Sequence, residues 1–436
     1  MDKMADVLGR AGAWCGQNKY LSAIKNAFQN FMPLTIAGAI GVLWCNVLVN
    51  DQTGLGLFFK PIMALDFLNP AFQAVNFCTI SCITVGITLG IAQEIGVWNM
   101  GAEKAGYIPG LVGLAAWLSV TNTSHMVEGA KEAFTGIAGN ELGATGLFTG
   151  MIIGVLSVEL FCFFEKQDAL KIKMPEQVPP GVARAFEVLV PATITLIITA
   201  CIGSACYNLT GLYLNDVIKN GIQGPLGAVG ATIPGVMIIY LVIMLFWLVG
   251  IHGNNMLSAV KEALFTPLAL ENVEKFNKGE KPTNIINMYA LQMWGEFGGS
   301  GVTIGLVIAI MIFGKREDNK AIATLSLVPG LFNINETVTF GVPMVLNPIL
   351  GIPFVVAPLI TIIIGYVLTV IGFCPVACLT VPWTTPPIVF GFLACGANVM
   401  GAVTQAILIV VSTVIYVPSV SYTHLTLPTT HKCRSR

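Results

Sequence analysis

Near its C-terminus the chain holds 95 consecutive residues, 337 to 431, without a single Asp, Glu, Lys or Arg. Roughly a quarter of an ordinary soluble domain is charged, so such a stretch does not fit a water-facing surface. The whole chain follows the same trend, with 22 Lys or Arg and 23 Asp or Glu in 436 residues. A net charge of −1 and the lack of a basic block exclude disordered, collagen-like and nucleic-acid-binding classes. An all-α polytopic membrane protein remains.

Further uncharged stretches predict membrane spans along the rest of the chain. A spanning helix needs about 20 apolar residues, and one or two spans per stretch give roughly eight to eleven. The expected spans are Phe31–Val49, Pro70–Gln93, Ile108–Val120, Gly146–Phe164, Val188–Cys206, Thr232–Val249, Val302–Phe313, Phe354–Phe373 and Met400–Val417. Helical spacing of apolar residues in Met4–Phe28 predicts an interfacial amphipathic helix before them.

The position of charge predicts the orientation of the chain. Basic residues cluster in Lys166–Arg184 and Lys315–Lys320, and both clusters are expected on the cytosolic side. A cytosolic N-terminus followed by four crossings puts the first cluster there. The charged segment Met256–Pro282 also looks cytosolic, so a single span at 302–313 cannot connect it to the second cluster. A re-entrant piece or an extra short span around Met288–Gly301 would make the number of crossings between the two cytosolic segments even.

Polar clusters inside the apolar second half point to a transport site. Prolines and glycines break the uncharged run, and non-helical backbone at membrane depth is tolerated only where it lines a cavity or is buried in protein. Broken helices with adjacent polar side chains are therefore typical of substrate sites in transporters. The polar clusters are residues 247–255, 296–303, 329–337 and 381–386.

Glu336 has the strongest physical case among these polar residues. It is the last acidic residue of the chain, and a carboxylate in an apolar stretch costs about 2.5–3.5 kcal/mol to insert. Asn333 and Asn335 beside it carry amides that both donate and accept hydrogen bonds. Such a group suits a neutral ligand rich in hydroxyl groups. The alternative is a glutamate in a short cytosolic loop near Lys320.

The other candidates have two interpretations each. His252 lies in the floor of a polar pocket with Asn255, or it ends a span at the headgroup level. Trp247 and Trp383 stack on sugar faces, or they anchor the chain at the membrane surface. The glycine-rich run 298–301 cradles a polar group through backbone N–H groups, or it permits close helix packing.

Patterns of other enzyme classes are missing from the sequence. HExxH, GxSxG and Walker motifs do not occur, so neither a membrane protease nor an ATP-driven pump has support. The 11 cysteines lie mostly in apolar runs without a CxxC pair, which favours small buried hydrophobes over a metal or redox site. We therefore expect no metal and no cofactor.

Several of these runs resemble a known family. The matching runs are residues 18–28, 174–186, 250–253, 298–301, 333–343 and 382–386. On these motifs the chain, from about Lys19 to Val417, resembles the lactose/cellobiose/N,N′-diacetylchitobiose family of phosphotransferase-system permeases, enzyme IIC. The runs that begin at Met174 and Asn333 are specific to the family, whereas the glycine-rich run is much less so.

The resemblance implies a fold of about ten transmembrane helices with two re-entrant hairpins. Residues 1–210 would form the scaffold of a homodimer, and residues 211–417 the sugar-binding transport half. A β-linked disaccharide of the cellobiose, chitobiose or lactose type would bind from outside a bacterial plasma membrane and reach the cytosolic face. A phosphocysteine on a separate enzyme IIB would then phosphorylate its 6-hydroxyl group. The lipid bilayer, the disaccharide and phosphorylated enzyme IIB are the implied partners.

The resemblance also assigns roles to single residues. Glu336 matches the family's essential glutamate at the reactive hydroxyl group, and His252 matches the histidine beside it, so both are expected to be catalytic. Trp247 and Trp383 fall where sugar-contacting aromatic rings are expected. The substrate-binding set is completed by three asparagines that suit hydroxyl groups, namely Asn255, Asn333 and Asn335.

Residues 418–436 depart from the family, because they show neither helical periodicity nor family resemblance. We expect this tail to be non-native, in which case a fused enzyme IIB domain would have been lost. Two other functions are weighed beside the leading one. An ion-coupled sugar symporter would use the same broken helices and carboxylate, and would transport without enzyme IIB. A membrane sensor would bind ligand without accumulating it.

Overall fold

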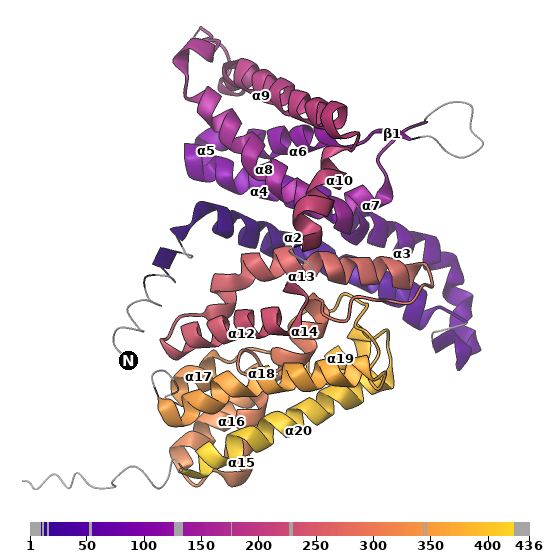
Figure 1. Cartoon of the computed structure of the whole chain (residues 1–436), viewed down its shortest axis with the longest axis vertical. Helices are drawn as coiled ribbons and strands as arrows, with labels where there is room; N and C mark the ends of the chain where they lie inside the picture. Colours follow the sequence, from indigo (N-terminus) through magenta and orange to yellow (C-terminus); the bar gives the residue numbers. More distant parts are fainter. Residues whose placement is uncertain are drawn as a thin grey trace, which may run out of the picture. The chain divides into compact units, whose positions relative to one another are not determined.

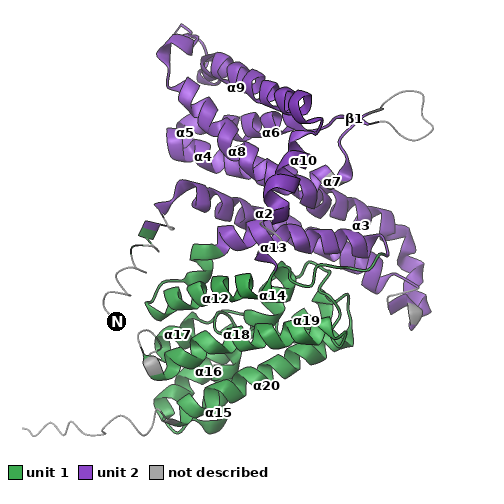
Figure 2. Ribbon diagram, viewed as in Figure 1, with its two compact units in different colours: residues 1–13, 232–257, 280–436 green, residues 14–231, 258–279 purple. Residues whose placement is uncertain are grey.

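The computed structural model describes residues 10, 13, 14, 17–51, 55–125, 134–175, 177–225, 230–342, 344 and 347–422. Regular structure in these ranges is helical, apart from one hairpin of two-residue strands (Figure 1). The chain divides into two compact units (Figure 2). Unit 1 comprises residues 1–13, 232–257 and 280–436, and unit 2 comprises residues 14–231 and 258–279. One helix, α13, contributes residues to both units.

Unit 2 contains the hairpin and the first set of helices. Its strands β1 (Ser124–His125) and β2 (Phe134–Thr135) pair antiparallel, with Ser124 opposite Thr135. Its helices are α2 (Lys19–Leu43), α3 (Asn69–Asn76), α4 (Ile83–Met100), α5 (Ala102–Ala105), α6 (Ile108–Val120), α7 (Gly139–Leu142), α8 (Ala144–Glu165), α9 (Pro180–Thr210) and α10 (Leu214–Ile218). Short 3-10 or π-helical turns are Trp44–Leu48, Leu55–Leu57, Lys60–Leu68, Phe77–Ser81, Asp168–Leu170 and Lys219–Gln223.

In the structure one helix, α2, joins the predicted surface helix 4–28 to the predicted first span 31–49, and the described residues 10, 13, 14 and 17 before it are helical as well. Asn18 caps α2 by accepting hydrogen bonds from the backbone N–H groups of Tyr20 and Leu21. The helix then continues without interruption to Leu43, so the predicted change from a surface helix to a span near residue 30 does not occur. Polar residues that looked surface-facing have partners inside unit 2, because Asn26 donates to Glu94 of α4 at 2.9 Å. Residues 4–9, 11, 12, 15 and 16 of the predicted surface helix lie outside the described residues.

Small residues bring the central helices of unit 2 close together. Helix α4 packs against α6 and α8, which also pack against each other. A Cβ atom on Gly113 of α6 would lie 2.3 Å from the Cβ of Ala92, and one on Gly150 of α8 would lie 2.2 Å from Oγ1 of Thr88. Close helix approach through small side chains is the usual packing mode where lipid surrounds the helices.

Unit 1 is built from shorter and more broken elements. Its helices are α12 (Ile233–Leu248), the start of α13 (Gly253–Asn277), α14 (Met288–Gly295), α15 (Ile304–Phe313), α16 (Glu317–Leu331), α17 (Glu336–Gly341), α18 (Pro348–Val370), α19 (Val389–Ala394) and α20 (Val399–Tyr422). Helix α20 packs against α15, α18 and α19, while α12 and α14 pack against α18.

Two breaks in unit 1 fall at polar clusters named from the sequence. Residues 296–303 separate the eight-residue α14 from the ten-residue α15. Residues 332–335 separate α16 from the six-residue α17. None of these three short helices is near the roughly 20 residues of a full span. The structure therefore has a short helix and a break around 288–303, where the sequence predicted either a re-entrant piece or an extra short span, and a second helix break at 332–335.

Helix length identifies fewer complete spans than the roughly ten expected. Among the described residues, five helices are long and apolar enough to cross a membrane, or six if Lys60–Ser81 and Ile83–Met100, bent by 42°, form one span. Three shorter apolar helices are α6, α12 and α15. The predicted all-α membrane class is confirmed, and the count by length is lower because bends and breaks divide the apolar segments.

The end of the last helix corrects one predicted boundary. Helix α20 extends to Tyr422, so residues 418–422, assigned from the sequence to a tail without periodicity, are helical. Pro418 lies inside this helix and does not end it. The remainder of the predicted tail, residues 423–436, lies outside the described residues.

Candidate functional site

Glu336 and His252, far apart in the sequence, meet in unit 1. Glu336 is the first residue of α17, and His252 lies in the turn between α12 and α13. His252 Nε2 and Glu336 Oε1 are 3.6 Å apart, and 35% and 47% of the two side chains are exposed. The pair is thus close enough for an electrostatic contact and open enough for a ligand to approach.

The backbone next to His252 determines which ring nitrogen carries the proton. His252 Nδ1 accepts a hydrogen bond from the backbone N–H of Asn255 at 3.2 Å. A neutral imidazole has one donor and one acceptor nitrogen, so Nε2 carries the hydrogen when the ring is neutral. Nε2 is also the ring nitrogen nearest Glu336, and its 3.6 Å separation from Oε1 is longer than a hydrogen bond.

The indole of Trp247 packs against the imidazole of His252. The two ring centroids are 4.4 Å apart and the ring planes are tilted by 48°. Phe340 and Phe354 lie beside the same indole, at 6.3 and 6.4 Å between ring centroids. Only 1% of Trp247 is exposed, so it offers no free face to a sugar in this structure. Its assignment as a sugar contact stays a prediction.

Trp383 differs from Trp247 because 43% of it is exposed. It lies between α18 and α19, in a segment without helical structure. The backbone carbonyl of Trp383 accepts a hydrogen bond from the amide of Asn333. The backbone of this segment is therefore fixed by Asn333, while the indole ring of Trp383 stays partly exposed. Its predicted sugar contact is compatible with this exposure and is not tested by it.

Asn333 bonds to two other segments of unit 1. Its Oδ1 accepts from the backbone N–H of Gly298 at 2.6 Å, and its Nδ2 donates to the carbonyl oxygens of Trp383 and Thr385. The structure therefore joins three of the predicted polar clusters through one side chain. The predicted contact between this amide and substrate remains untested.

Asn335 adds a second connection to the glycine-rich run. Its Nδ2 donates to the carbonyl oxygen of Ser300 at 2.8 Å, and only 3% of the residue is exposed. Gly299 has φ of +90°, and a Cβ atom there would lie 2.7 Å from the Cβ of Asn335. A glycine is required at this position for two reasons, the left-handed backbone and the close approach.

The glycine-rich run serves packing rather than an open cradle of N–H groups. The Gly298 N–H donates to Asn333. A Cβ atom on Gly301 would lie 2.2 Å from the ring of Phe354, and the Gly301 carbonyl accepts from the hydroxyl of Tyr416 at 2.7 Å. These contacts favour the second of the two interpretations, close packing.

One polar contact next to this run was not predicted. The hydroxyl of Tyr240, on α12, donates to Glu296 Oε1 at 2.7 Å, and Tyr240 is buried. The sequence places Glu296 in a polar cluster, and a carboxylate in an apolar region signals a partnered group. Nothing in the spacing singled out Tyr240 as its partner.

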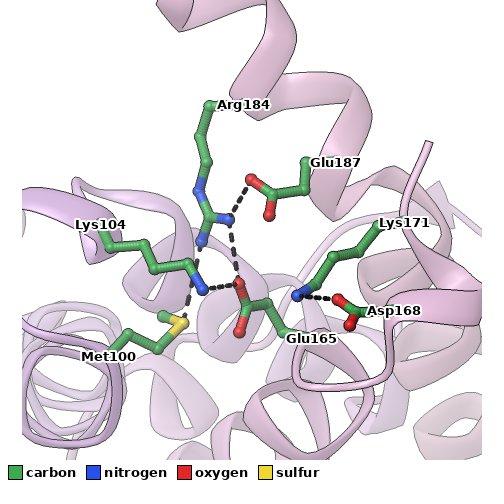
Figure 3. Close-up of polar contacts among 7 residues, drawn as sticks. All are labelled: Met100, Lys104, Glu165, Asp168, Lys171, Arg184 and Glu187. Carbon is green, nitrogen blue, oxygen red and sulfur yellow. Dashed lines mark hydrogen bonds and ion pairs between the residues drawn. The ribbon is translucent and has the colours of Figure 1, made fainter. Parts of the chain in front are cut away.

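A separate ionic cluster holds the C-terminal end of α8 in unit 2 (Figure 3). Glu165, 1% exposed, accepts from Lys104 at 2.8 Å and from Arg184 at 3.0 Å, while Arg184 also contacts Glu187 at 2.7 Å. Arg184 belongs to the run 174–186 that carried the family resemblance, and it fastens the start of α9. The sequence predicted only a basic cytosolic cluster here, because pairing depends on helix packing.

An exposed ion pair lies beside this cluster. Lys171 donates to Asp168 at 3.0 Å, and the ammonium group lowers the pKa of the Asp168 carboxyl group (Figure 3). Asp168 is 81% exposed, in contrast to the buried Glu165. Surface pairs of this kind contribute little stability. Of the two carboxylates, Glu165 is therefore the one expected to stabilise the contact between the end of α8 and the start of α9.

Comparison with known proteins identifies the family. The family model of the phosphotransferase system EIIC proteins matches residues 25–358. The chain belongs to the phosphotransferase-system EIIC family. This EIIC protein is 32% identical over 422 residues to the oligo-beta-mannoside-specific EIIC component of Bacillus subtilis (strain 168), which covers 96% of this chain and 92% of the relative. It is 30% identical over 476 residues to the cellobiose-specific EIIC component of Lactococcus lactis subsp. lactis (strain IL1403), with 96% of each chain covered.

A solved structure supports the same conclusion for the fold. The EIIC chain superposes on the crystal structure of the transporter ChbC, the IIC component of the N,N′-diacetylchitobiose-specific phosphotransferase system, with a TM-score of 0.85. The two are 29% identical, and the match covers 94% of each chain. The predicted family, helical fold class and role in sugar transport through the phosphotransferase system are confirmed. The ion-coupled symporter is not favoured.

Proposed function

We propose that this EIIC protein imports a β-linked disaccharide and presents its 6-hydroxyl group to a phosphocysteine of enzyme IIB. The observation that carries the proposal is the pair formed by Glu336 and His252, 3.6 Å apart and both partly exposed. It lies in unit 1, where broken helices bring polar groups together. The site therefore offers a carboxylate and an oriented N–H group to a hydroxyl-rich ligand.

The proposed reaction transfers one phosphoryl group and one proton. The 6-hydroxyl oxygen attacks the phosphorus, the P–S bond to the enzyme IIB cysteine breaks, and the cysteine leaves as a thiolate. Glu336 accepts the hydroxyl proton as the new O–P bond forms. The Nε2–H group of His252 orients the carboxylate, and fixed geometry of this kind lowers the entropic part of the barrier. The charged sugar phosphate then leaves into the cytosol.

The sugar class follows from the relatives and the accessible polar surface. The relatives named above are specific for an oligo-beta-mannoside, cellobiose and N,N′-diacetylchitobiose, all of which contain β-linked pyranoses. In the proposed site, the exposed ring of Trp383 stacks on the C–H face of a pyranose, and the exposed Asn255 bonds a hydroxyl group. Trp247, Asn333 and Asn335 support these groups through their contacts with His252, Gly298 and Ser300.

The proposal extends to the orientation and assembly of the chain. The N-terminus lies in the cytosol of a bacterium, together with the basic clusters Lys166–Arg184 and Lys315–Lys320, by the positive-inside rule. Unit 1 contains all the proposed site residues and acts as the sugar-binding part. Unit 2 acts as the scaffold of a homodimer.

Uptake into membrane vesicles tests this function. Radiolabelled cellobiose is supplied outside, with and without phosphorylated enzyme IIB inside, and the internal label is separated into free and phosphorylated sugar. We expect accumulation only with phosphorylated enzyme IIB, all of it as 6-phosphate, and no loss of accumulated label on addition of an uncoupler. Accumulation of free sugar without enzyme IIB, collapsed by the uncoupler, would overturn the proposal in favour of the symporter.

A further inference from the structure

The amide of Asn333 has no spare donor for a ligand in this structure. Both hydrogens of its Nδ2 group are directed to backbone carbonyls, those of Trp383 and Thr385, and its Oδ1 accepts from the N–H of Gly298. A primary amide has two donor hydrogens, so both are used. A sugar hydroxyl could receive a hydrogen bond from Nδ2 only by displacing one of these contacts.

The backbone at Asn333 is also specialised. Its φ is +62°, in the left-handed region that only glycine and, less readily, asparagine and aspartate adopt with low strain. The residue turns the chain between α16 and α17, three positions before Glu336. The side chain and the backbone conformation of Asn333 therefore both fix the start of α17.

The segments that Asn333 joins carry the two exposed groups of the site. Glu336, 47% exposed, follows it in the chain, and Trp383, 43% exposed, is hydrogen-bonded to it through its own carbonyl. Asn335 reinforces the same connection by donating to the carbonyl of Ser300, two residues after the Gly298 that donates to Asn333. One hydrogen-bonded centre thus sets the positions of the carboxylate and the ring.

We infer that Asn333 is a positioning residue, which fixes Glu336 and the Trp383 segment relative to each other instead of binding the sugar itself. This inference rests on the proposed function, because it assigns Glu336 to the reactive hydroxyl and Trp383 to the pyranose face. It predicts that loss of the Asn333 amide acts on turnover through Glu336 and on sugar affinity through Trp383.

Two substitutions separate the hydrogen bonds from the backbone. Asn333→Gly keeps the left-handed backbone and removes all three bonds, while Asn333→Asp keeps the size and Oδ1 but turns a carboxylate oxygen toward two carbonyl oxygens. We expect kcat/KM for phosphorylation by enzyme IIB to fall at least about 50-fold in Asn333→Gly and further in Asn333→Asp. Asn319→Gly, the same exchange in the first turn of α16 away from the site, serves as the control and keeps kcat/KM within about twofold.

Double-mutant cycles test the positioning role directly. Asn333→Gly is combined with Glu336→Asp for kcat and with Trp383→Ala for the dissociation constant of the sugar in detergent. If Asn333 acts through these residues, its substitution adds less than about threefold in each altered background. Independent, multiplicative effects in both cycles would show that Asn333 contacts the sugar itself and would overturn the inference.

The same variants keep this inference distinct from the proposed function. Wild-type kcat in Glu336→Asp and Glu336→Gln would end the proposed function, and the inference with it. A strong loss in Glu336→Gln with wild-type kcat and sugar affinity in Asn333→Gly would end the inference alone. Should Asn333→Gly fail to fold, the isosteric Asn333→Asp provides the same cycles, and wild-type activity in that variant would be equally decisive.

Discussion

At the level of single residues, the proposed chemistry depends on the hydrogen-bond state of His252. The backbone N–H of Asn255 is shared between Nδ1 and the backbone carbonyl of His252, which favours a neutral ring with its hydrogen on Nε2, the nitrogen nearest Glu336. The indole of Trp247 beneath the imidazole keeps the ring in this orientation. The proposed role of the histidine is that of an N–H donor to the carboxylate.

Substitution of His252 tests this assignment. His252→Ala removes the Nε2–H donor, and we expect kcat for sugar phosphorylation to fall about 100-fold, the usual scale of a misplaced acid–base group. His252→Gln carries an amide N–H of similar reach, and it should recover part of this loss. The measurement is steady-state phosphorylation by purified enzyme IIB. Equal kcat in the alanine and glutamine variants would contradict a donor role.

The sequence was enough to propose the residues of the candidate site, but it could not predict their individual surroundings. Scarcity of charge singled out Glu336, and the structure brings it to His252. The same reasoning could not separate the buried Trp247 from the exposed Trp383, since both lie in apolar runs. Nor could spacing show that the amide of Asn333 would form hydrogen bonds with backbone groups of two distant segments.

At the scale of elements, the broken helices of unit 1 depend on close contacts at the glycine-rich run. The sequence located these breaks because prolines, glycines and polar residues coincide there. Long apolar helices such as α9 and α18 were also located, with ends that differ from the predicted ones by several residues. The continuity of α2 could not be foreseen, because its polar residues have partners on α4 that only tertiary structure supplies.

A glycine exchange tests the packing of this run. Gly299→Ala places a methyl group against Asn335 at a left-handed position, and we expect a loss of about 2–3 kcal/mol in stability from strain and overpacking. Gly372→Ala is the matched control, because Gly372 has φ of +79° and nothing within 4 Å of the added Cβ. Thermal unfolding in detergent should show a clearly larger drop for Gly299→Ala. Equal drops would mean that the contact with Asn335 does not matter.

The buried ion pairs of Glu165, between α8 and α9, allow an independent test of stability in unit 2. Glu165→Gln leaves Lys104 and Arg184 without their buried carboxylate, and we expect a loss of about 3 kcal/mol, typical of a broken buried ion pair. Asp168→Asn removes the exposed carboxylate nearby and should leave the unfolding temperature within experimental error. Similar unfolding temperatures for both variants would contradict a stabilising role for Glu165.

At the level of the whole molecule, the protein is an EIIC family member whose proposed site residues lie in one of its two units. The family match covers residues 25–358 and thus parts of both units, while the proposed site residues all belong to unit 1. Composition predicted the membrane class, and motif resemblance predicted the family. Neither could predict that α13 would divide its residues between the units, because apolar and charged patterns say which residues leave water but not which element they contact.

We propose that Glu336, the carboxylate directly before the 95-residue uncharged stretch, performs the proton transfer. The most direct test measures kcat for disaccharide phosphorylation by phosphorylated enzyme IIB in Glu336→Gln. Glu317→Gln is the control, since Glu317 is in the same unit and 86% exposed. We predict that Glu336→Gln loses at least about 1,000-fold in kcat, with normal membrane insertion, while Glu317→Gln equals the wild type. Phosphorylation at the wild-type rate by Glu336→Gln would contradict the account.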